Sequence, residues 1–293
     1  MIVDEGSMAP PPAVVVAGNC AKRHFIVIGD PLQLAPVCTF DKTEKLVRFW
    51  LGVDVYTHGH YTLDEAGAGV HHSVLLPYQS RMHTDICDLV REPVYKGLLK
   101  DRDPHAYRPA FRPEPEYPVV LYDTGGEPLA LAHHPKKTGQ SRYNEYHAEL
   151  AVALAKLVLA DLPDERRKPE YIGIVTPYRA QRDAIKEQIQ GTDLEVYCRV
   201  GTVHAYQGLE FDILIFDLVE SPGLAIAPFL RGGWGSEAMR LLNVGVTRAR
   251  HKLFVVANMH YIREQMPASS VLRKITERAY QKRGIPAAQF LHQ

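Results

Sequence analysis

Continuous runs of apolar residues recur along the chain, separated by segments with helical periodicity or by loops. The runs are MIVDE (1–5), FIVIGD (25–30), VVLYD (119–123), YIGIVTP (171–177), RVGTVH (199–204), DILIFDLV (212–219) and KLFVVAN (252–258). Strands that are apolar without alternation are typical of strands buried on both faces. Two intervening segments, 142–160 and 178–190, are predicted helices. Alternation of such strands with helices predicts an α/β fold with doubly wound parallel sheets.

Three segments rich in Gly, Pro or charged residues are predicted loops: 101–118, 124–141 and 221–236. The third is a long Gly/Pro loop that precedes a predicted helix. Loops of that length in a compact domain are often functional, although an exposed insertion fits the same pattern.

The charge balance is even, with 34 Lys and Arg against 34 Asp and Glu in 293 residues. Any nucleic-acid binding therefore needs a local basic surface, since the bulk charge neither favours nor excludes it. The scattered cysteines lack the close pairs of zinc or redox motifs, and we expect four reduced, buried thiols: Cys20, Cys38, Cys87 and Cys198.

No run approaches the roughly 18 apolar residues that a bilayer crossing requires, so we expect a cytoplasmic protein with no membrane partner. Three pairs of histidines raise the possibility of a metal site: His58/His60, His71/His72 and His133/His134. Each pair lies in a polar or Gly/Pro-rich stretch without a carboxylate or cysteine at ligand spacing. We therefore expect solvated loop histidines.

Six short polar segments follow one another in an order that points to phosphate chemistry. They are DEG (4–6), GDPLQLAPV (29–37), QSRM (79–82), VTPYRAQ (175–181), TVHAYQGLEFD (202–212) and NVGVTRAR (243–250). Cleavage of a terminal phosphate needs a metal ligand, a group that orients water, and cations that neutralise charge. Asp4 can bind Mg²⁺ and Glu5 can orient the water. Arg81 and Arg248 can bind phosphate oxygens with two parallel hydrogen bonds.

In this order and at these spacings the segments resemble motifs II, III, IV, V and VI of superfamily 1 helicases, with QSRM at the start of the second motor domain. The most similar branch is the one that contains the nonsense-mediated-decay RNA helicase. The resemblance spans residues 1 to about 260 and implies RecA-like motor domains that use ATP and Mg²⁺ to act on single-stranded DNA or RNA.

The resemblance also implies a role for individual residues. Asp4 is then the Mg²⁺ ligand, Glu5 the catalytic base, and Gln33 the sensor that couples the γ-phosphate to nucleic acid. Arg81 and Arg248 are the γ-phosphate arginines. The remaining nucleotide-binding candidates are Gly29, Asp30, Gln79, Gly208 and Glu210, and the nucleic-acid-binding candidates are Thr176, Tyr178, Thr202 and His204. For Tyr178 a packed core aromatic is an equal alternative.

The chain departs from the family pattern at a few positions. Ser80 stands where the family has a tyrosine that stacks on adenine, and Tyr78 is the nearest ring that could replace it. His204 occupies a position that is often acidic, and Gly6 one that is often alanine or serine. None of these changes removes a charge that hydrolysis requires.

No G-x-x-x-x-G-K-[ST] phosphate loop occurs in the sequence. In the family that loop precedes the carboxylate pair, so the resemblance implies a C-terminal part of a motor, whose missing N-terminal segment belongs to a parent chain or a separate polypeptide. We expect a remnant of the first motor domain over 1–75 and a complete second motor domain over 76–293. We also expect the phosphate-loop strand between 1–5 and 25–30, leaving both without their shared neighbour.

The leading hypothesis is an ATP-dependent helicase or translocase that is active once the phosphate loop is supplied. The alternative is a module that binds nucleic acid or a protein partner without hydrolysis. A Rossmann-like metabolic enzyme is a third, more distant reading, supported only by the alternation of strands and helices.

Overall fold

The computed structural model describes residues 1–38, 44–61, 72–103, 110–125 and 135–291. Within it the chain divides into two compact units, Met1–Pro77 and Tyr78–Gln293. Three of the candidate loop histidines, His71, His133 and His134, lie outside the described residues.

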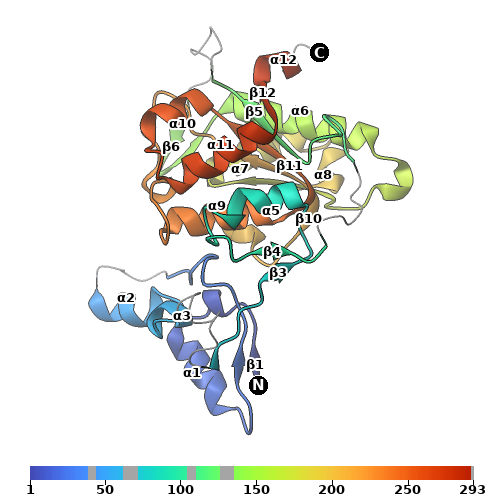
Figure 1. The fold of residues 1–293 in the computed structure, drawn as a ribbon. Coiled ribbons are helices and arrows are strands. Elements are labelled where there is room, and N and C mark those ends of the chain that lie inside the picture. The colour runs from blue at the N-terminus through green and yellow to red at the C-terminus, as the bar shows by residue number, and fades with distance from the viewer. Residues whose placement is uncertain (39–43, 62–71, 104–109, 126–134, 292–293) are drawn as a thin grey trace. The chain divides into compact units, whose positions relative to one another are not determined.

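The first unit contains a short parallel sheet and a few helices (Figure 1). Strand β1 (Ile2–Val3) pairs with β2 (Ile26–Val27), and Ile2 lies opposite Ile26. The connection between them consists of a 3-10 turn, η1 (Gly6–Met8), and helix α1 (Pro11–Asn19). Helices α2 (Lys45–Leu51) and α3 (Val55–His58) follow.

The direct pairing of β1 with β2 corrects the expectation that a phosphate-loop strand lies between these two runs. Backbone hydrogen bonds continue beyond the strands, since Ile28 N donates to Val3 O at 2.8 Å. The backbone groups of the two runs therefore form hydrogen bonds with each other, and no missing strand lies between them.

Much of the apolar surface of the first unit is not covered by the described residues. Exposed apolar side chains occur on both strands and on two helices: Ile2, Val15, Val16, Ile26, Leu46, Phe49 and Trp50. Single exposed apolar residues are ordinary, but a group of this size on about 77 residues leaves little buried core. We therefore expect low stability for this unit alone.

The second unit is built on a six-stranded parallel sheet in the order β12-β5-β11-β10-β8-β9. Its strands are β5 (Val119–Asp123), β8 (Ile172–Thr176), β9 (Cys198–Thr202), β10 (Phe211–Asp217), β11 (Ala249–Ala257) and β12 (Gly284–Pro286). Five of them coincide with predicted apolar runs. The sequence pattern did not indicate β12, which is short and contains Gly284 and Pro286.

Helices cover both faces of this sheet (Figure 1). Helices α6 (Glu145–Asp161) and α7 (Arg179–Ile189) pack with the core on one face. Helices α5 (Thr84–Arg91), α9 (Glu237–Thr247) and α11 (Val271–Arg283) lie against the opposite face. This arrangement confirms the predicted doubly wound, RecA-like α/β class.

Alternation along the central strands divides the core between the two faces. Ile213 and Ile215 of β10 belong to the core beneath α6 and α7, whereas Phe216 packs against Gly245 of α9. An added Cβ at Gly245 would lie 2.6 Å from Cζ of Phe216. The absence of a side chain at Gly245 therefore permits the close approach of α9 to the sheet.

The remaining elements of the second unit are short. They are β3 (Tyr78–Gln79) paired with β4 (Lys100–Asp101), the hairpin β6 (Lys136–Thr138) and β7 (Ser141–Tyr143), α8 (Leu194–Tyr197), α10 (Met259–Gln265), α12 (Ala287–Leu291) and the 3-10 turns η4 (Asp164–Arg166), η5 (Val203–Tyr206) and η6 (Pro228–Leu230). In the described part of the chain, no helix has the length and hydropathy needed to cross a bilayer.

The cysteines and histidines differ in part from expectation. None of the four cysteines, all within the described residues, forms a disulfide, but only Cys87 and Cys198 are buried, whereas Cys20 is exposed. His58 is not a solvated loop residue. It ends α3 and packs against Phe49, with ring centroids 4.4 Å apart.

Candidate nucleotide and nucleic-acid sites

The predicted catalytic carboxylates lie where the two strands of the first unit end. Asp4 and Glu5 follow β1, and Gly29 and Asp30 follow β2. The two loops touch, because Gly6 N donates to Ile28 O at 2.8 Å and an added Cβ at Gly29 would lie 2.7 Å from Gly6 N. Carboxyl ends of neighbouring parallel strands are where α/β folds bind ligands, and here they bring both loops together.

Local hydrogen bonds shape each of these loops. Asp30 closes its own turn by accepting from Leu32 N at 2.9 Å and from Gln33 Nε2 at 3.1 Å. Glu5 adopts a left-handed conformation with φ of 52°, which is uncommon for a side-chain-bearing residue and concentrates at functional sites. Its amide donates to Asp4 Oδ1 at 2.8 Å. Asp30 therefore orients Gln33, and the Asp4–Glu5 turn is held by its own carboxylate.

Tyr56 of α3 is a polar residue at these loops that sequence reasoning did not single out. Its hydroxyl is buried and has no hydrogen-bond partner among the described residues. It lies beside the two glycine loops, 2.8 Å from where a Cβ of Gly6 would stand. Burial, followed by Asp54, Asp30, Asp4 and Glu5, raises the pKa of Tyr56 to about 12. In the sequence, the only signal for this residue is a tyrosine two positions after Asp54.

These residues fit a hydrated Mg²⁺ ion. Mg²⁺ keeps several waters and takes only one or two protein carboxylates together with substrate phosphates. Asp4 is exposed and can provide such a carboxylate. Among the residues that the structure describes, no cluster of three or more His, Cys, Asp or Glu side chains could hold a metal ion. The protein ligands here would therefore be few.

The second unit brings Arg81, Glu210 and Arg250 together at one end of the sheet. Arg81 Nε donates to Glu210 Oε2 at 2.7 Å, and Arg250 Nη1 lies 3.5 Å from Glu210 Oε1. The side chains of Arg81 and Glu210 are 38% and 43% exposed. The cluster lies next to Phe211 and Ala249, the first residues of β10 and β11, whose pairing brings Glu210 to Arg250. Arg250 Nη1 also lies 3.5 Å from Asp212 Oδ1. Two partly exposed guanidiniums that share Glu210 form a surface suited to an anionic group.

Arg248 differs from the expectation for this motif. Helix α9 ends at Thr247 and Arg248 caps it, whereas Arg250, two residues further on, belongs to β11. Arg248 is 1% exposed, and its guanidinium donates to Leu209 O at 3.3 Å and Thr247 Oγ1 at 3.1 Å. In this structure the exposed cations of the motif region are therefore Arg81 and Arg250.

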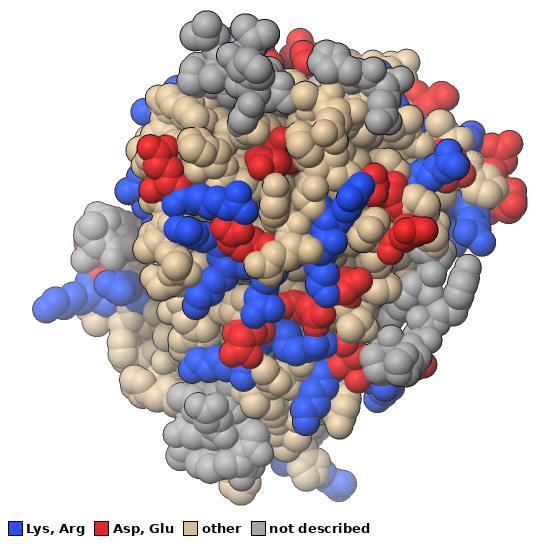
Figure 2. All heavy atoms as spheres, turned by 45° about the horizontal axis from the view of Figure 1, so that its top comes forward, with Lys and Arg blue, Asp and Glu red and all other residues tan. Residues whose placement is uncertain are grey.

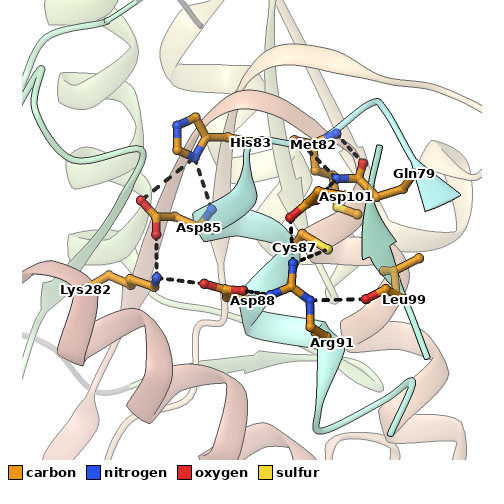
Figure 3. A network of polar contacts seen from close by, with 10 residues as sticks. All are labelled: Gln79, Met82, His83, Asp85, Cys87, Asp88, Arg91, Leu99, Asp101 and Lys282. Atoms are coloured by element: carbon orange, nitrogen blue, oxygen red, sulfur yellow. Dashed lines mark hydrogen bonds and ion pairs between the residues drawn. The ribbon is translucent and has the colours of Figure 1, made fainter. Parts of the chain in front are cut away.

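A polar network holds the segment that carries Arg81 (Figure 3). The amide group of Gln79 bonds Met82 at both its backbone atoms, with Gln79 Oε1 accepting from Met82 N at 2.7 Å. Gln79 Nε2 also donates to Asp101, which accepts from Arg91 Nη2 at 2.6 Å. The side chain of Gln79 is thus engaged within the unit, which favours a role in positioning over direct contact with nucleotide.

The same network extends to helix α11. Arg91 pairs with Asp88, and Lys282 of α11 lies 3.0 Å from Asp88 Oδ2 and also contacts Asp85 (Figure 3). His83 N donates to Arg250 O at 2.7 Å. Helix α5 is therefore tied to α11, and the residue before it is tied to the strand that bears Arg250.

Two of the nucleic-acid candidates, Thr176 and Tyr178, have buried side chains. The Tyr178 hydroxyl donates to Glu220, and Arg142 Nη1 pairs with the same carboxylate at 2.9 Å. Burial raises the pKa of Glu220, while the Tyr178 hydroxyl and Arg142 act in the opposite direction. Tyr178 is therefore a packed core aromatic, which was the alternative interpretation of this residue. Its hydroxyl holds Glu220 in the loop that follows β10, and contact of this segment with nucleic acid stays a prediction.

The other candidates lie nearer the surface. Thr202 is partly exposed at the end of β9, and His204, Gly208 and Glu210 are exposed in the segment that follows. Gly208 has φ of +80° and no heavy atom within 4 Å of an added Cβ, so a backbone turn is presented without a covering side chain. On the face shown in Figure 2, Lys and Arg lie interspersed with Asp and Glu, without a region of one sign.

A family model for the AAA domain matches residues 62–260. This match covers more than half of the chain. The chain belongs to the AAA-domain family. Regulator of nonsense transcripts 1 of Dictyostelium discoideum is 29% identical over 272 residues, which is 88% of this chain and 18% of that protein. Helicase sen1 of Schizosaccharomyces pombe is 26% identical over 269 residues, which is 90% of this chain and 15% of that protein.

These relatives confirm the resemblance to the superfamily 1 helicases of the nonsense-mediated-decay branch. The helicase region described here spans 18% and 15% of the length of these two relatives. Among solved structures, the PRRSV helicase aligns with a TM-score of 0.42 at 16% identity, over 92% of this chain and 37% of that one.

Proposed function

We propose that this AAA-domain chain supplies the C-terminal part of an ATP-dependent helicase. It hydrolyses ATP with Mg²⁺ and moves along single-stranded DNA or RNA when a phosphate loop is provided by another segment. In this proposal residues 1–75 are a remnant of the first motor domain and residues 76–293 are the second motor domain. A cytoplasmic location belongs to the same proposal.

The exposed Arg81–Glu210–Arg250 cluster is the observation that carries this proposal. A phosphate group can displace the carboxylate of Glu210 from the two guanidiniums, because exposed ion pairs contribute only about 0–1 kcal/mol and exchange easily. Such cations stabilise the charge that develops on a transferring phosphoryl group. The network of Gln79, Asp101 and Arg91 holds the backbone beside Arg81, which limits the entropy lost when it binds.

The first unit supports the same function. It presents Asp4 and Glu5 on one loop and Gln33 on the loop that touches it, which matches a metal ligand, a base and a γ-phosphate sensor. Its exposed apolar side chains favour coverage by further polypeptide. The names of the two relatives given above, a regulator of nonsense transcripts and a helicase, support the same function.

A second candidate is a module that binds nucleic acid or a protein partner without hydrolysis. The burial of Arg248 favours it, since a guanidinium that is 1% exposed and bonded to Leu209 O does not reach a phosphate without local rearrangement. The two candidates differ in ATP turnover: only the helicase candidate predicts hydrolysis, and only there should loss of an arginine lower its rate.

The test joins this chain to a segment that contains a phosphate loop and measures ATP hydrolysis with single-stranded nucleic acid present. Arg81→Ala should lower kcat by about 10³-fold while nucleotide affinity falls far less, because a transition-state contact affects turnover more than ground-state binding. Arg112→Ala, at a residue whose side chain is 73% exposed, is the matched control and should leave kcat within about twofold.

Arg248→Ala and Arg250→Ala complete the set. Arg248→Ala should abolish hydrolysis and also destabilise the second unit, since it leaves the partly buried carbonyl of Leu209 without that donor. Arg248→Lys, which retains a charge, separates the two effects. Arg250→Ala should have an intermediate effect because it shares Glu210 with Arg81. A joined protein that binds nucleic acid but shows no stimulated hydrolysis would favour the binding module. Hydrolysis that stays within a few-fold of the parent for both Arg81→Ala and Arg248→Lys would refute the roles proposed for these two arginines.

A further inference from the structure

The sheet of the second unit ends at β9, and this edge is open in the described structure. Strand β9 pairs with β8 on one side, with Cys198 opposite Ile172 and Thr202 opposite Thr176. On its other side it pairs with no strand of the part of the chain that the structure describes. An edge strand presents a row of backbone donors and acceptors that proteins normally cover or block.

A slot with a volume of about 750 Å³ lies along this edge. Its lining includes four consecutive residues of β9, from Cys198 to Gly201, together with residues of α7 and of η5. Consecutive strand residues point to opposite faces of a sheet. A cavity that touches all four therefore lies beside the strand and not over one face.

The two walls of the slot stand on opposite faces of the sheet. Val200 belongs to the core that includes Ile185 and Ile189 of α7, so α7 forms one wall. Its neighbour Gly201 faces Tyr206 of η5, because an added Cβ at Gly201 would lie only 2.2 Å from Cε2 of that ring. The buried Tyr206 hydroxyl donates to Ile174 O at 3.1 Å and to Arg199 O, which fixes this second wall. The slot is thus formed before any partner binds.

The charges of the lining disfavour a nucleic acid. The lining has three basic side chains, Arg182, Lys186 and Arg199, against four acidic ones, Glu170, Asp183, Glu187 and Glu195. Two of the basic groups are already paired, Arg182 with Asp183 at 2.7 Å and Arg199 with Glu170 at 2.9 Å. Binding of a phosphate backbone depends on a surplus of cations, which this lining lacks. A polypeptide that is neutral or basic is compatible with it.

We propose that the slot receives an extended segment of a partner polypeptide, neutral or basic in charge, which adds to β9 as a seventh strand. Backbone hydrogen bonds along five residues of β9 provide most of the affinity, and side chains at alternate positions of the guest contact the walls formed by α7 and Tyr206. This site is separate from the Arg81–Glu210–Arg250 cluster and does not depend on ATP hydrolysis.

The test selects random linear peptides of about twelve residues, displayed on phage, on the full chain and then measures binding of the selected peptides by fluorescence polarisation. Hydrogen exchange is followed with and without peptide. We expect slower exchange of the amides of β9. N-methylation of one alternating set of peptide residues should weaken binding by at least about tenfold and the other set far less, since only alternate residues of a guest strand bond to β9.

Substitutions in the two walls provide the protein side of the test. Lys186→Trp on α7 and Ala205→Trp on η5 both fill the slot from exposed positions and should each weaken binding by at least about tenfold. Gln188→Trp, also exposed on α7 but outside the slot, is the matched control and should bind within about twofold of the parent.

Four outcomes would overturn the proposal. They are binding that survives both wall substitutions, equal effects of the two N-methylated sets, and a library that yields no peptide protecting β9. The fourth is protection of the β9 amides by another occupant, either single-stranded oligothymidine or a second copy of the chain at high protein concentration.

Discussion

Lys252 of β11 is buried with a charge that the interior disfavours, so the stability of the second unit should depend on pH. The side chain is 1% exposed, and its ammonium group donates to the backbone carbonyls of Glu114 and Tyr117. Burial lowers the pKa of Lys252 from 10.5 to about 7, against the smaller opposing effect of Glu114. Between these two values the folded state binds fewer protons than the unfolded state.

The sign and size of the effect follow from proton linkage. Because the folded pKa lies below the unfolded one, the free energy of unfolding rises with pH across this window. The penalty is complete below about pH 7 and absent above about pH 10.5. The slope approaches about 1.4 kcal/mol per pH unit. At about pH 7 the Lys252 ammonium is half protonated in the folded state, so the slope there is only half as steep. Between about pH 7 and pH 8.5, Lys252 should therefore raise the free energy of unfolding by roughly 1.6 kcal/mol.

The assay uses the fact that the chain has only two tryptophans, Trp50 and Trp234, one in each unit. In a Trp50→Phe background, the fluorescence of Trp234 reports urea unfolding of the second unit. The free energy of unfolding of the Lys252→Met variant should not show this rise with pH. The difference in the free energy of unfolding between variant and parent should therefore change by roughly 1.6 kcal/mol over the window. Taking this difference cancels the opposing contributions of Cys87 and Cys198, whose pKa values burial raises to about 12.

Lys156→Met, at an exposed position of α6, is the control and should follow the parent at every pH. Parallel curves for the parent and Lys252→Met across the whole window would refute the reasoning, because they would show that the ammonium group is not desolvated.

Three further predictions concern the chain itself. Calorimetry with Mg·ATP should show weak binding, since no backbone cradle for the β- and γ-phosphates is provided by a G-x-x-x-x-G-K-[ST] loop in this sequence; micromolar affinity would contradict this. Fluorescence anisotropy with unrelated single strands should show weak, salt-sensitive and sequence-tolerant binding, and one sequence that binds orders of magnitude tighter would refute the assignment of Thr202 and His204. Gly245→Val should destabilise the second unit by about 1–3 kcal/mol in urea unfolding because of its contact with Phe216, whereas Gly233→Val, with no heavy atom nearer than 4.0 Å, should not; equal stability of the two variants would contradict the packing argument.

The sequence by itself determined the class of fold and most of the strands. Apolar runs without alternation are a direct consequence of burial on both faces, and this signal is local, so β5, β8, β9, β10 and β11 could be read from it. The order of the polar motifs likewise identified the helicase family, because chemistry at strand ends needs particular residue types in a given order.

Tertiary structure alone decided which of these side chains can meet a ligand. Arg248 and Arg250 are two residues apart in one motif, yet the end of α9 falls between them, and one guanidinium is buried while the other is exposed beside Glu210. Tyr178 is buried, and its hydroxyl donates to Glu220, which also pairs with Arg142; both of these residues are far from Tyr178 in sequence. The pairing of β1 with β2 and the open edge of β9 also depend on which strands become neighbours, a long-range property that no local pattern contains.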